Sequence, residues 1–288
     1  MKNKIIFTVD LEFWYNSEFL KNDFKKNCVA QNDFITESVG PLLKLLKKYK
    51  IKATFFVLGE VAEKYPDLIY KISKEDHEIA SHGYSHKTLK KLGRKQFEEQ
   101  IVKSKKLIEK IIHHRLLGFR APEFSLDRNS SWAIDILKKH GFVYDASIFP
   151  YKTPLYGSSS APVEIYRISS SQLYQPDKSS QFFEFPATVF RQGNLRVLIA
   201  GGFYFRFIPF PIYLKFLNAT LKKQPVVFYI HTHELLNFFP RLQSNWWKGK
   251  LKYWGTSNAL NKLELLFKKY SFVSVVNYLK DAGNQKVF

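Results

Sequence analysis

The sequence predicts an α/β fold, a distorted barrel of about seven or eight strands with helices between the strands. Short runs of β-branched and aromatic residues alternate along the chain with longer segments whose apolar residues recur at helical spacing. The chain has 288 residues, of which 45% are hydrophobic, so it is long enough to bury one large core. Repeated alternation within a single domain favours a barrel over an open sheet.

Each apolar run is expected to form a strand, and the amphipathic segments between the runs are expected to form helices. Apolar residues recur at helical spacing from Leu42 to Tyr49 and, over a longer segment, from Phe97 to Ile112. The expected strands cover residues 5–10, 53–58, 78–81, 116–120, 143–146, 182–186, 226–230 and 272–275.

Two segments interrupt this alternation, and both are expected to belong to one domain that covers residues 1–288. Residues 151–215 contain serine-rich stretches and short strand-like pieces, which predicts an inserted segment or lid. Residues 235–288 are expected to form a C-terminal extension, which begins with a long aromatic connection containing Trp246, Trp247 and Trp254. Long loops in compact domains are usually functional or disordered.

The charge and the apolar patterning bear on the partner. The formal net charge of +20 favours an anionic neighbour. The lysines are spread over helix faces instead of forming a basic arm, so no nucleic-acid partner is expected, and solvated helix faces are the alternative explanation. Residues 189–217 are strongly apolar and contain interspersed arginines, which suits an anionic membrane surface and a lipid-linked saccharide. A core strand followed by an inner helix is the alternative.

Localisation is predicted from what the sequence lacks. The apolar run at the start of the chain ends at Asp10 and is too short for a secretory signal. Cys28 is the single cysteine, so no intramolecular disulfide is possible. No stretch approaches the about 20 apolar residues of a spanning helix. We therefore expect a cytoplasmic protein, peripheral at the inner face of the membrane.

Polar residues suited to catalysis follow the predicted strands. In a parallel barrel the carboxyl ends of the strands lie on one face, where active sites are built, so these side chains are expected to converge. They are Asp10 and Glu12 after the first strand, His82 and His86 after the third, Arg120 after the fourth, Asp145 in the fifth and His231 after residues 226–230.

His82 and His86 are the expected metal ligands. A spacing of four places both imidazoles on one face of a helical turn, and together with a carboxylate they leave positions open on a divalent cation. A capped helix start is the alternative. Asp10 and Glu12 would divide two tasks, one binding the metal and the other taking a proton from the attacking water. Their spacing does not decide which of the two binds the metal and which takes the proton. The alternative interpretation is that both residues only form a charged rim.

Arg120 is expected to hold the carboxylate base ionised and oriented, with a surface salt bridge as the alternative. His231 is expected to act as the general acid toward a leaving amine. Asp145 is expected to pair with His231 and keep it protonated, and His233 is the competing acid.

The residues named above belong to short motifs, and the order of these motifs along the chain resembles that of the polysaccharide deacetylase family. This family is carbohydrate esterase family four, which is also called the NodB-homology domain. The segment Gly201 to Arg206 is similar to a bacterial subgroup linked to exopolysaccharide biosynthesis. The chain departs from the family pattern at Glu12, which is not adjacent to the first aspartate, at Tyr229, which replaces a leucine, and in Thr232-His233-Glu234. The matching motifs are Thr8-Val9-Asp10, His82-Gly83-Tyr84-Ser85-His86, Arg120-Ala121-Pro122, Asp145-Ala146-Ser147 and Tyr229-Ile230-His231.

The resemblance implies a barrel of the NodB-homology type and a metal-dependent hydrolase. The substrate would be an N-acetylated amino sugar of a glycan or lipid-linked saccharide, and the oxyanion would be stabilised by a backbone N–H near Tyr151. The implied roles are Asp10 as base, Arg120 as the residue that orients it, His231 as acid tuned by Asp145, Glu12, His82 and His86 as metal ligands, and Tyr151, Pro122 and Arg206 as substrate contacts.

The metal would be a divalent cation, Zn²⁺ first, with Co²⁺, Ni²⁺ and Fe²⁺ as alternatives that the ligand types allow. Two other functions stay open. One is an amidohydrolase that acts on a small cyclic amide or a formamide on the same barrel. The other is a metal-free sugar-binding module.

Overall fold

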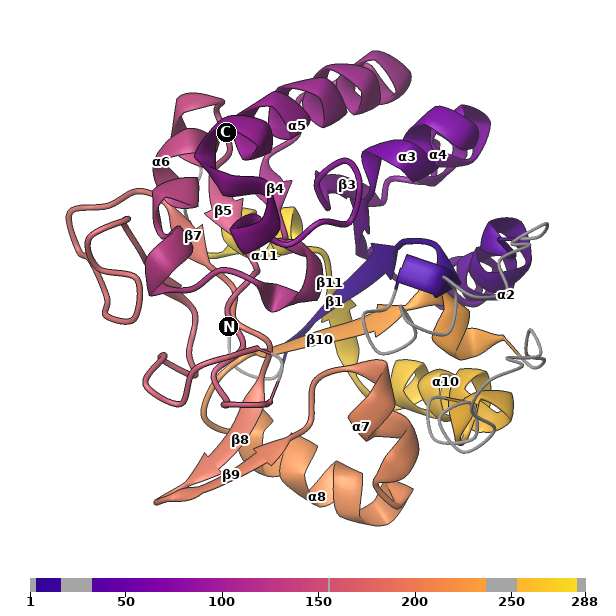
Figure 1. Cartoon of the computed structure of the whole chain (residues 1–288). Helices are drawn as coiled ribbons and strands as arrows, with labels where there is room; N and C mark the ends of the chain where they lie inside the picture. Colours follow the sequence, from indigo (N-terminus) through magenta and orange to yellow (C-terminus); the bar gives the residue numbers. More distant parts are fainter. Residues whose placement is uncertain (1–3, 17–32, 155, 237–252, 284–288) are drawn as a thin grey trace.

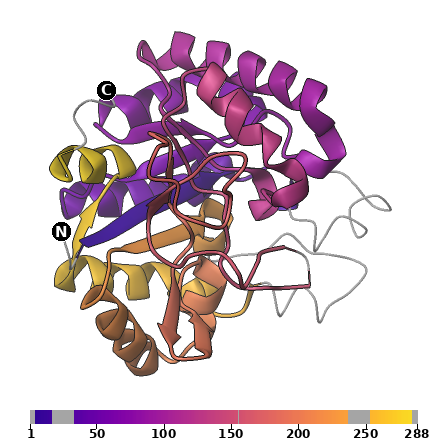
Figure 2. The same ribbon diagram turned by 90° about the vertical axis from the view of Figure 1, so that its left-hand side faces the viewer.

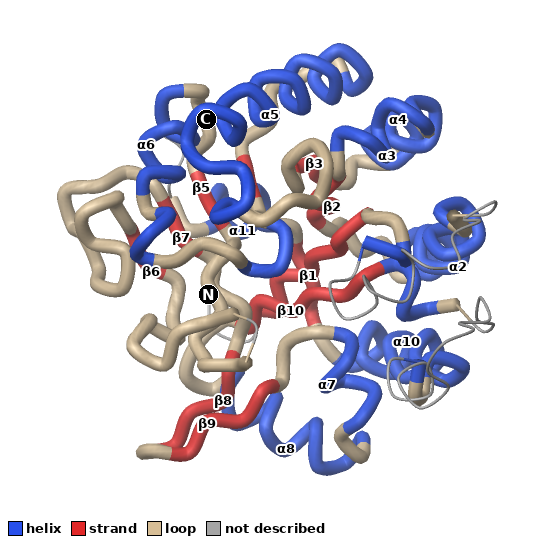
Figure 3. The backbone as a smooth tube through the Cα atoms, viewed as in Figure 1, coloured by secondary structure: helices blue, strands red, loops and turns tan. Residues whose placement is uncertain are grey.

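A curved sheet lies at the centre of the molecule, and helices surround it (Figures 1 and 3). The computed structural model describes residues 4–16, 33–154, 156–236 and 253–283. The predictions that concern Cys28, Trp246 and Trp247 lie outside these residues.

Within the described residues the sheet has nine strands, and β6 alone runs antiparallel to its neighbour, β7. All eight expected strands occur within two residues of their predicted bounds, and the runs 116–120, 143–146 and 182–186 are each reduced to two residues. The order is β10 (Val226–His231), β1 (Lys4–Leu11), β2 (Thr54–Val57), β3 (Glu78–Ser81), β4 (Gly118–Phe119), β5 (Tyr144–Asp145), β7 (Phe183–Glu184) and β6 (Tyr166–Arg167), and β11 (Ser271–Val273) pairs with the start of β1.

Strand β1 is buried from Ile5 to Leu11. Parallel strands covered on both faces are near-continuous apolar runs, and β1 departs from such a run only at Thr8 and Asp10. Thr8 is satisfied because its Oγ1 donates to the carbonyl of Phe228, 3.1 Å away. In the parallel register between β1 and β10, Asp10 lies level with His231. The pairing of these two strands therefore brings a carboxylate and an imidazole to the same edge of the sheet.

The sheet curls until its two ends approach each other. Thr188, just beyond β7, donates its backbone N–H to the carbonyl of Val227 in β10, at 3.2 Å. In return, the N–H of Val227 donates to Thr188 Oγ1 at 2.7 Å. This single residue links the two ends where no strand ladder is recorded among the described residues. The predicted α/β barrel is confirmed in this form, as a curled, incompletely closed parallel sheet.

Helices pack around the sheet through the apolar stripes that the sequence predicted. Leu42 and Leu46 are buried on α2, and Phe97, Ile101 and Ile108 are buried on α5. The α-helices are α2 (Ile35–Lys48), α3 (Gly59–Lys64), α4 (Pro66–Lys74), α5 (Leu89–Ile112), α6 (Trp132–Lys139), α7 (Gly202–Phe207), α8 (Phe210–Leu221), α10 (Ala259–Lys269) and α11 (Val275–Asp281). The 3₁₀-helices are η1 (Trp14–Asn16), η3 (Pro122–Phe124), η4 (Arg128–Ser130), η5 (Thr232–Leu235) and η6 (Thr256–Asn258).

The segment predicted as an insertion at 151–215 is rich in loops, which face the viewer in Figure 2. It is not wholly inserted, because β7 belongs to the central sheet. Beyond β7 the chain forms a hairpin of β8 (Val189–Gln192) and β9 (Leu195–Leu198), and then α7 and α8. The apolar run 189–217 is therefore a hairpin and two helices, not one core strand and one inner helix.

Candidate active site

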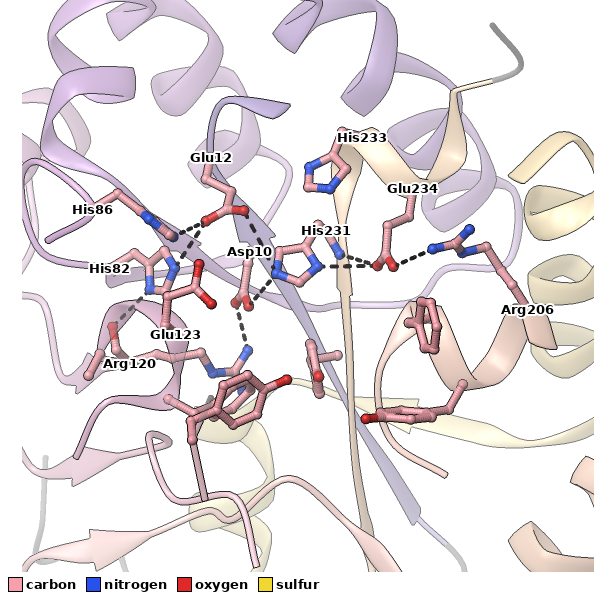
Figure 4. Close-up of a pocket in the computed structure, with 16 residues that line it drawn as sticks. Asp10, Glu12, His82, His86, Arg120, Glu123, Arg206, His231, His233 and Glu234 are labelled. Atoms are coloured by element: carbon pink, nitrogen blue, oxygen red, sulfur yellow. Dashed lines mark hydrogen bonds and ion pairs between the residues drawn. The ribbon is translucent and has the colours of Figure 1, made fainter. Parts of the chain in front are cut away.

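The ends of β1, β3, β4 and β10 border a pocket of about 300 Å³. Its polar lining includes Asp10, Glu12, His82, His86, Arg120 and His231, so six of the seven side chains expected to converge do so (Figure 4). The lining also includes five aromatic residues, Phe124, Tyr156, Phe203, Tyr204 and Tyr229.

Glu12, His82 and His86 form a compact cluster in which one ligand atom from each lies within 4.8 Å of the others. Glu12 Oε2 lies 2.5 Å from His86 Nε2 and 3.5 Å from His82 Nε2. This oxygen is buried and has no hydrogen-bond partner among the described residues. His82 Nδ1 lies 2.8 Å from the carbonyl of Arg120, which requires the proton on Nδ1 and leaves the Nε2 lone pair facing Glu12. A buried carboxylate and two imidazoles oriented in this way fit a divalent cation.

The two imidazoles do not meet on a helical turn, as their spacing predicted. Residues 82–88 form no helix, and His86 has a φ of 49° while Gly83 has a φ of 80°. These left-handed residues fold the loop back so that His86 returns toward His82. The ring centroids lie 5.5 Å apart. Strain of this kind in a non-glycine residue is commonly found at functional sites.

Asp10 has a different partner from Glu12. Arg120, which is fully buried, donates from Nη1 to Asp10 Oδ1 at 2.7 Å and to Thr8 Oγ1 at 3.0 Å. Its guanidinium lies over the ring of Phe56, with Cζ 4.1 Å from the centroid. Contacts with Thr8 and Phe56 thus hold the Arg120 guanidinium in place beside Asp10. The second carboxylate oxygen of Asp10, Oδ2, faces His231 Nε2 at 3.7 Å. The geometry assigns Glu12 to the imidazoles and Asp10 to the guanidinium.

His231 lies between carboxylates. Its Nε2 is 3.8 Å from Glu12 Oε1, and its Nδ1 is 3.3 Å from Glu234 Oε2. Burial acts to lower the pKa of His231, but Glu12 and Glu234 outweigh it and raise the pKa to about 9. Burial acts to raise the pKa of Glu234, but Arg206 and His231 outweigh it, so the pKa of Glu234 lies below its usual range.

Asp145 does not pair with His231, which corrects the sequence-based assignment. Its carboxylate is fully buried and accepts from Ser147, from Oγ at 2.5 Å and from the backbone N–H at 3.1 Å. Burial and the neighbouring Asp145 raise the pKa of Glu184. Ser147 Oγ in turn accepts from the N–H of Ala121, at 2.7 Å. Asp145 therefore braces the chain beside Arg120, and Glu234 faces the histidine.

The expected substrate contacts also change. Among the described residues, Pro122 and Tyr151 are absent from the pocket lining, and Phe124 and Tyr156 are present. Glu123 and Phe124, with φ values of 57° and 47°, turn the chain after Pro122 and bring Glu123 to the pocket. Arg206 does reach the lining, but its guanidinium is bound to Glu234, with Nη2 3.0 Å from Oε1.

His233 and Glu234 follow His231 in η5, and the two histidine rings stack with centroids 5.1 Å apart. Glu234 departs from the family motif, and the motif implies no role for it. Its spacing of three from His231 was the available signal, because residues three apart lie close together in a helical turn. His231, not His233, occupies the position beside both Asp10 and Glu12.

Residues 22–144 match the family model for polysaccharide deacetylases, and residues 146–280 match a domain of unknown function, DUF3473. A peptidoglycan-N-acetylglucosamine deacetylase from Bacillus cereus is 41% identical over 88 residues, which are 31% of this chain and 30% of that protein. A peptidoglycan deacetylase from Helicobacter pylori is 38% identical over 109 residues, which are 37% of this chain and 36% of that protein. Residues 22–144 are thus similar to the polysaccharide deacetylase family, and the chain spans about a third of the length of these two relatives.

Solved structures share the fold of this chain. A protein from Mycobacterium smegmatis assigned as a polysaccharide deacetylase aligns with a TM-score of 0.66 at 17% identity, over 100% of this chain and 92% of that chain. Puue allantoinase aligns with a TM-score of 0.62 at 15% identity, over 99% of this chain and 91% of that chain. These likenesses support the curled α/β architecture.

The pocket draws on both matched segments and on residues that precede them. Asp10 and Glu12 precede the first match, whereas His82, His86 and Arg120 lie within it. Glu123 also lies within the first match, and Arg206, His231, His233 and Glu234 lie within the segment of unknown function.

Proposed function

We propose that the protein is a metal-dependent hydrolase that removes N-acetyl groups from the amino sugars of a glycan. The main evidence is that two neighbouring carboxylates have different partners. Glu12 faces His82 and His86, whereas Asp10 is held by Arg120. One carboxylate is thereby placed to hold a cation, and the other to take a proton beside it.

Glu12, His82 and His86 would hold the metal, Zn²⁺ first and Co²⁺, Ni²⁺ or Fe²⁺ as alternatives. A bound divalent cation supplies Lewis acidity and lowers the pKa of water toward about 7. The fit rests on the buried Glu12 Oε2 without a hydrogen bond and on the Nδ1 contact that turns the lone pair of His82 inward.

The chain's own residues account for both proton transfers. Asp10 takes a proton from the attacking water at Oδ2, because its Oδ1 is bound to Arg120. Water adds to the acetyl carbon, and the C–N bond then breaks. His231 gives a proton from Nε2 to the nitrogen, which leaves as the amine while acetate is released. Against the effect of burial, the carboxylates around His231 raise its pKa, which favours the protonated imidazole that this step requires.

The aromatic wall of the pocket supports a sugar substrate. Tyr156, Tyr204 and Tyr229 line it with Phe124, and the rings of Phe124 and Tyr229 pack with centroids 4.9 Å apart. Aromatic faces bind apolar faces of ligands, and phenolic hydroxyls add hydrogen bonds. The named relatives are peptidoglycan deacetylases, which makes peptidoglycan glycan strands one substrate to test. An exopolysaccharide or a lipid-linked saccharide is the other.

Acetate release tests the proposed function. The Zn²⁺-loaded protein is expected to release acetate from N-acetylated chito-oligosaccharides or peptidoglycan fragments, and to leave a cyclic imide and a formamide intact. Turnover of the imide or formamide without acetate release would contradict the proposal and favour the alternative amidohydrolase. Binding of the oligosaccharide without turnover, at full metal loading, would favour a sugar-binding module.

We also propose that the pocket rim works at an anionic membrane surface from the cytoplasmic side. Phe203 and Trp254 are 37% and 62% exposed, and Phe207 lies between them, with ring centroids 4.4 Å and 6.3 Å away. Ile212, at the start of α8, is 46% exposed. Such an apolar rim, on a chain with a net charge of +20, suits the interface of anionic lipids.

Vesicle flotation tests the membrane proposal. The protein should float with vesicles containing phosphatidylserine, and the double variant Phe203→Ser, Trp254→Ser should float less. Tyr70→Ser, which removes an exposed ring from α4, is the matched control and should bind like the parent protein. Failure to bind at low salt would remove the proposal. Among the described residues no helix has the length and apolar character needed to span a bilayer.

A further inference from the structure

We propose that Glu234 and Arg206 form a positioning chain for His231, so that the segment of unknown function supplies the orientation of the general acid. The inference rests on the proposed function, because it needs His231 to protonate a leaving amine. Glu234 and Arg206 are named as positioning residues, since they act through His231.

Glu234 holds His231 at two points. Its Oε2 accepts from the backbone N–H of His231 at 2.9 Å and lies 3.3 Å from His231 Nδ1. A carboxylate at Nδ1 favours the proton there and fixes the plane of the ring. Nε2 is then directed to the side of the pocket where Asp10 and Glu12 lie, at 3.7 Å and 3.8 Å.

Arg206 fixes Glu234 in turn. The guanidinium donates from Nη2 to Glu234 Oε1 at 3.0 Å, from Nε to the carbonyl of Gly202 at 3.1 Å and from Nη1 to the carbonyl of Trp254 at 2.6 Å. Arg206 is 4% exposed and Glu234 is 6% exposed. A planar donor with three bonds in three directions has one available orientation, which a lysine does not reproduce.

The backbone around the pair is shaped to admit it. A Cβ added to Gly202 would lie 2.0 Å from Glu234 Oε2, closer than any side chain tolerates. Gly201, with a φ of 97°, would place a Cβ 2.7 Å from the ring of Tyr229. Two consecutive glycines thus allow the start of α7 to approach η5 and the end of β10. The close approach explains why a helix outside the strand-end pattern reaches the acid.

The side chain that the family pattern offers for this task is engaged elsewhere. Asp145 accepts hydrogen bonds from Oγ and from the backbone N–H of Ser147, and it shares a buried site with Glu184. The carboxylate in contact with the His231 ring on its Nδ1 side is Glu234. We therefore assign the positioning task to the Glu234–Arg206 pair.

Two substrates with different leaving groups test the assignment. An amine must be protonated to leave, whereas 4-nitrophenolate leaves without a proton. Glu234→Gln is expected to lower kcat for N-acetylated chito-oligosaccharide by about 10²-fold with KM unchanged, because acid catalysis contributes about that much. The same variant should keep 4-nitrophenyl acetate turnover within a few-fold of the parent. Arg206→Lys should show the same selectivity with a smaller loss, and Glu234→Asp should restore part of the amide activity.

Glu98→Gln, which removes a surface ion pair with Lys139, is the matched control and should change neither rate. Equal losses on both substrates, or no loss on the amide, would overturn the assignment. A measurement that does not depend on turnover distinguishes a failure of this assignment from a failure of the proposed function. In ¹⁵N NMR of the metal-free protein, the Nδ1 signal of His231 should be that of a protonated nitrogen and should move in Glu234→Gln but not in Glu98→Gln. An unchanged Nδ1 signal would overturn the assignment even if the parent protein deacetylates no substrate.

Discussion

The two sides of the pocket are built in different ways. The metal side, defined as Asp10, Glu12, His82, His86 and Arg120, takes every residue from the end of a parallel strand or from the loop that follows it. The acid side, defined as His231, Glu234 and Arg206, takes one residue from a strand end, one from η5 and one from α7. The metal side is ordered by sheet register and the acid side by a buried ion pair. Residues at strand ends can therefore be predicted from the alternation of strands and helices along the chain. Residues that are held by side chains from distant segments cannot, because their placement depends on tertiary contacts.

The largest expected effect separates the two carboxylates of the metal side. Asp10→Asn should lower deacetylase turnover by at least about 10³-fold, or about 4 kcal/mol in the activation free energy, because the base is lost. Zn²⁺ binding should persist, since Asp10 faces Arg120 instead of the imidazoles. Acetate release and metal content, measured on the same preparation, check both statements. Loss of metal from Asp10→Asn would exchange the roles of Asp10 and Glu12.

Glu12→Gln is the mirror experiment. It should reduce Zn²⁺ affinity by at least about 10-fold, the lower end of what altered metal ligation costs, and turnover should fall at limiting metal. A chelator should inactivate the parent protein, and added Zn²⁺ should restore it without a change in circular dichroism. Isothermal titration of metal into each apo variant gives the comparison. Full metal affinity in Glu12→Gln would show that the cation lies elsewhere.

Asp145 tests whether the acid side has been assigned correctly. Asp145→Asn should lower the free energy of unfolding by about 1–3 kcal/mol, because it disrupts the buried arrangement with Glu184 and Ser147. The ratio of amide to aryl-ester turnover should stay that of the parent protein, unlike in Glu234→Gln. Urea unfolding and the two assays measure both quantities. A selective loss of amide turnover would return Asp145 to the role that the family pattern implies.

Much of the metal side was predictable from sequence. Asp10, Glu12, His82, His86 and Arg120 each follow an apolar run, and the parallel sheet collects such positions. The predicted helical turn at His82–His86 was wrong because left-handed residues in the loop bring the rings together instead. Alternation along the chain gives strand ends, but it does not give loop conformation.

On the acid side the sequence predicted the role of His231, whereas Arg206 was expected only as a substrate contact. Arg206 lies 28 residues before Glu234, on a helix whose placement depends on two glycines and on the carbonyl of Trp254. No period or local spacing encodes such a contact. Asp145 was paired with His231 by the family pattern, and its true partner Glu184 lies on a two-residue strand. The sequence predicted this strand, as residues 182–186, but periodicity does not indicate that Glu184 packs beside Asp145.

The smallest effect concerns stability away from the pocket. His77 is buried, and its Nδ1 accepts from the N–H of Ala53 at 3.2 Å, so the folded protein favours the neutral ring. Burial, with Lys52 nearby, lowers the pKa of His77 from 6.5 to about 4. Between these pH values the unfolded chain binds more protons than the folded protein, so stability is lost as the pH falls through this window.

The contribution of His77 to this loss should be about 2 kcal/mol, somewhat less than the shift alone implies. Urea unfolding at pH 4.5 and pH 7 should show a smaller difference in His77→Gln than in the parent protein. Equal differences in the two proteins would mean that His77 is not the group that titrates.

The proposed function requires that Glu12, His82 and His86 bind a cation while Asp10 remains hydrogen-bonded to Arg120. Anomalous diffraction at the zinc absorption edge, from crystals grown with Zn²⁺, tests it most directly. We expect one anomalous difference peak, about 2.0–2.2 Å from a Glu12 oxygen and from Nε2 of both histidines. We also expect that Asp10 remains bonded to Arg120. A peak on Asp10, a peak away from these residues, or no peak at saturating Zn²⁺ would contradict the proposed function.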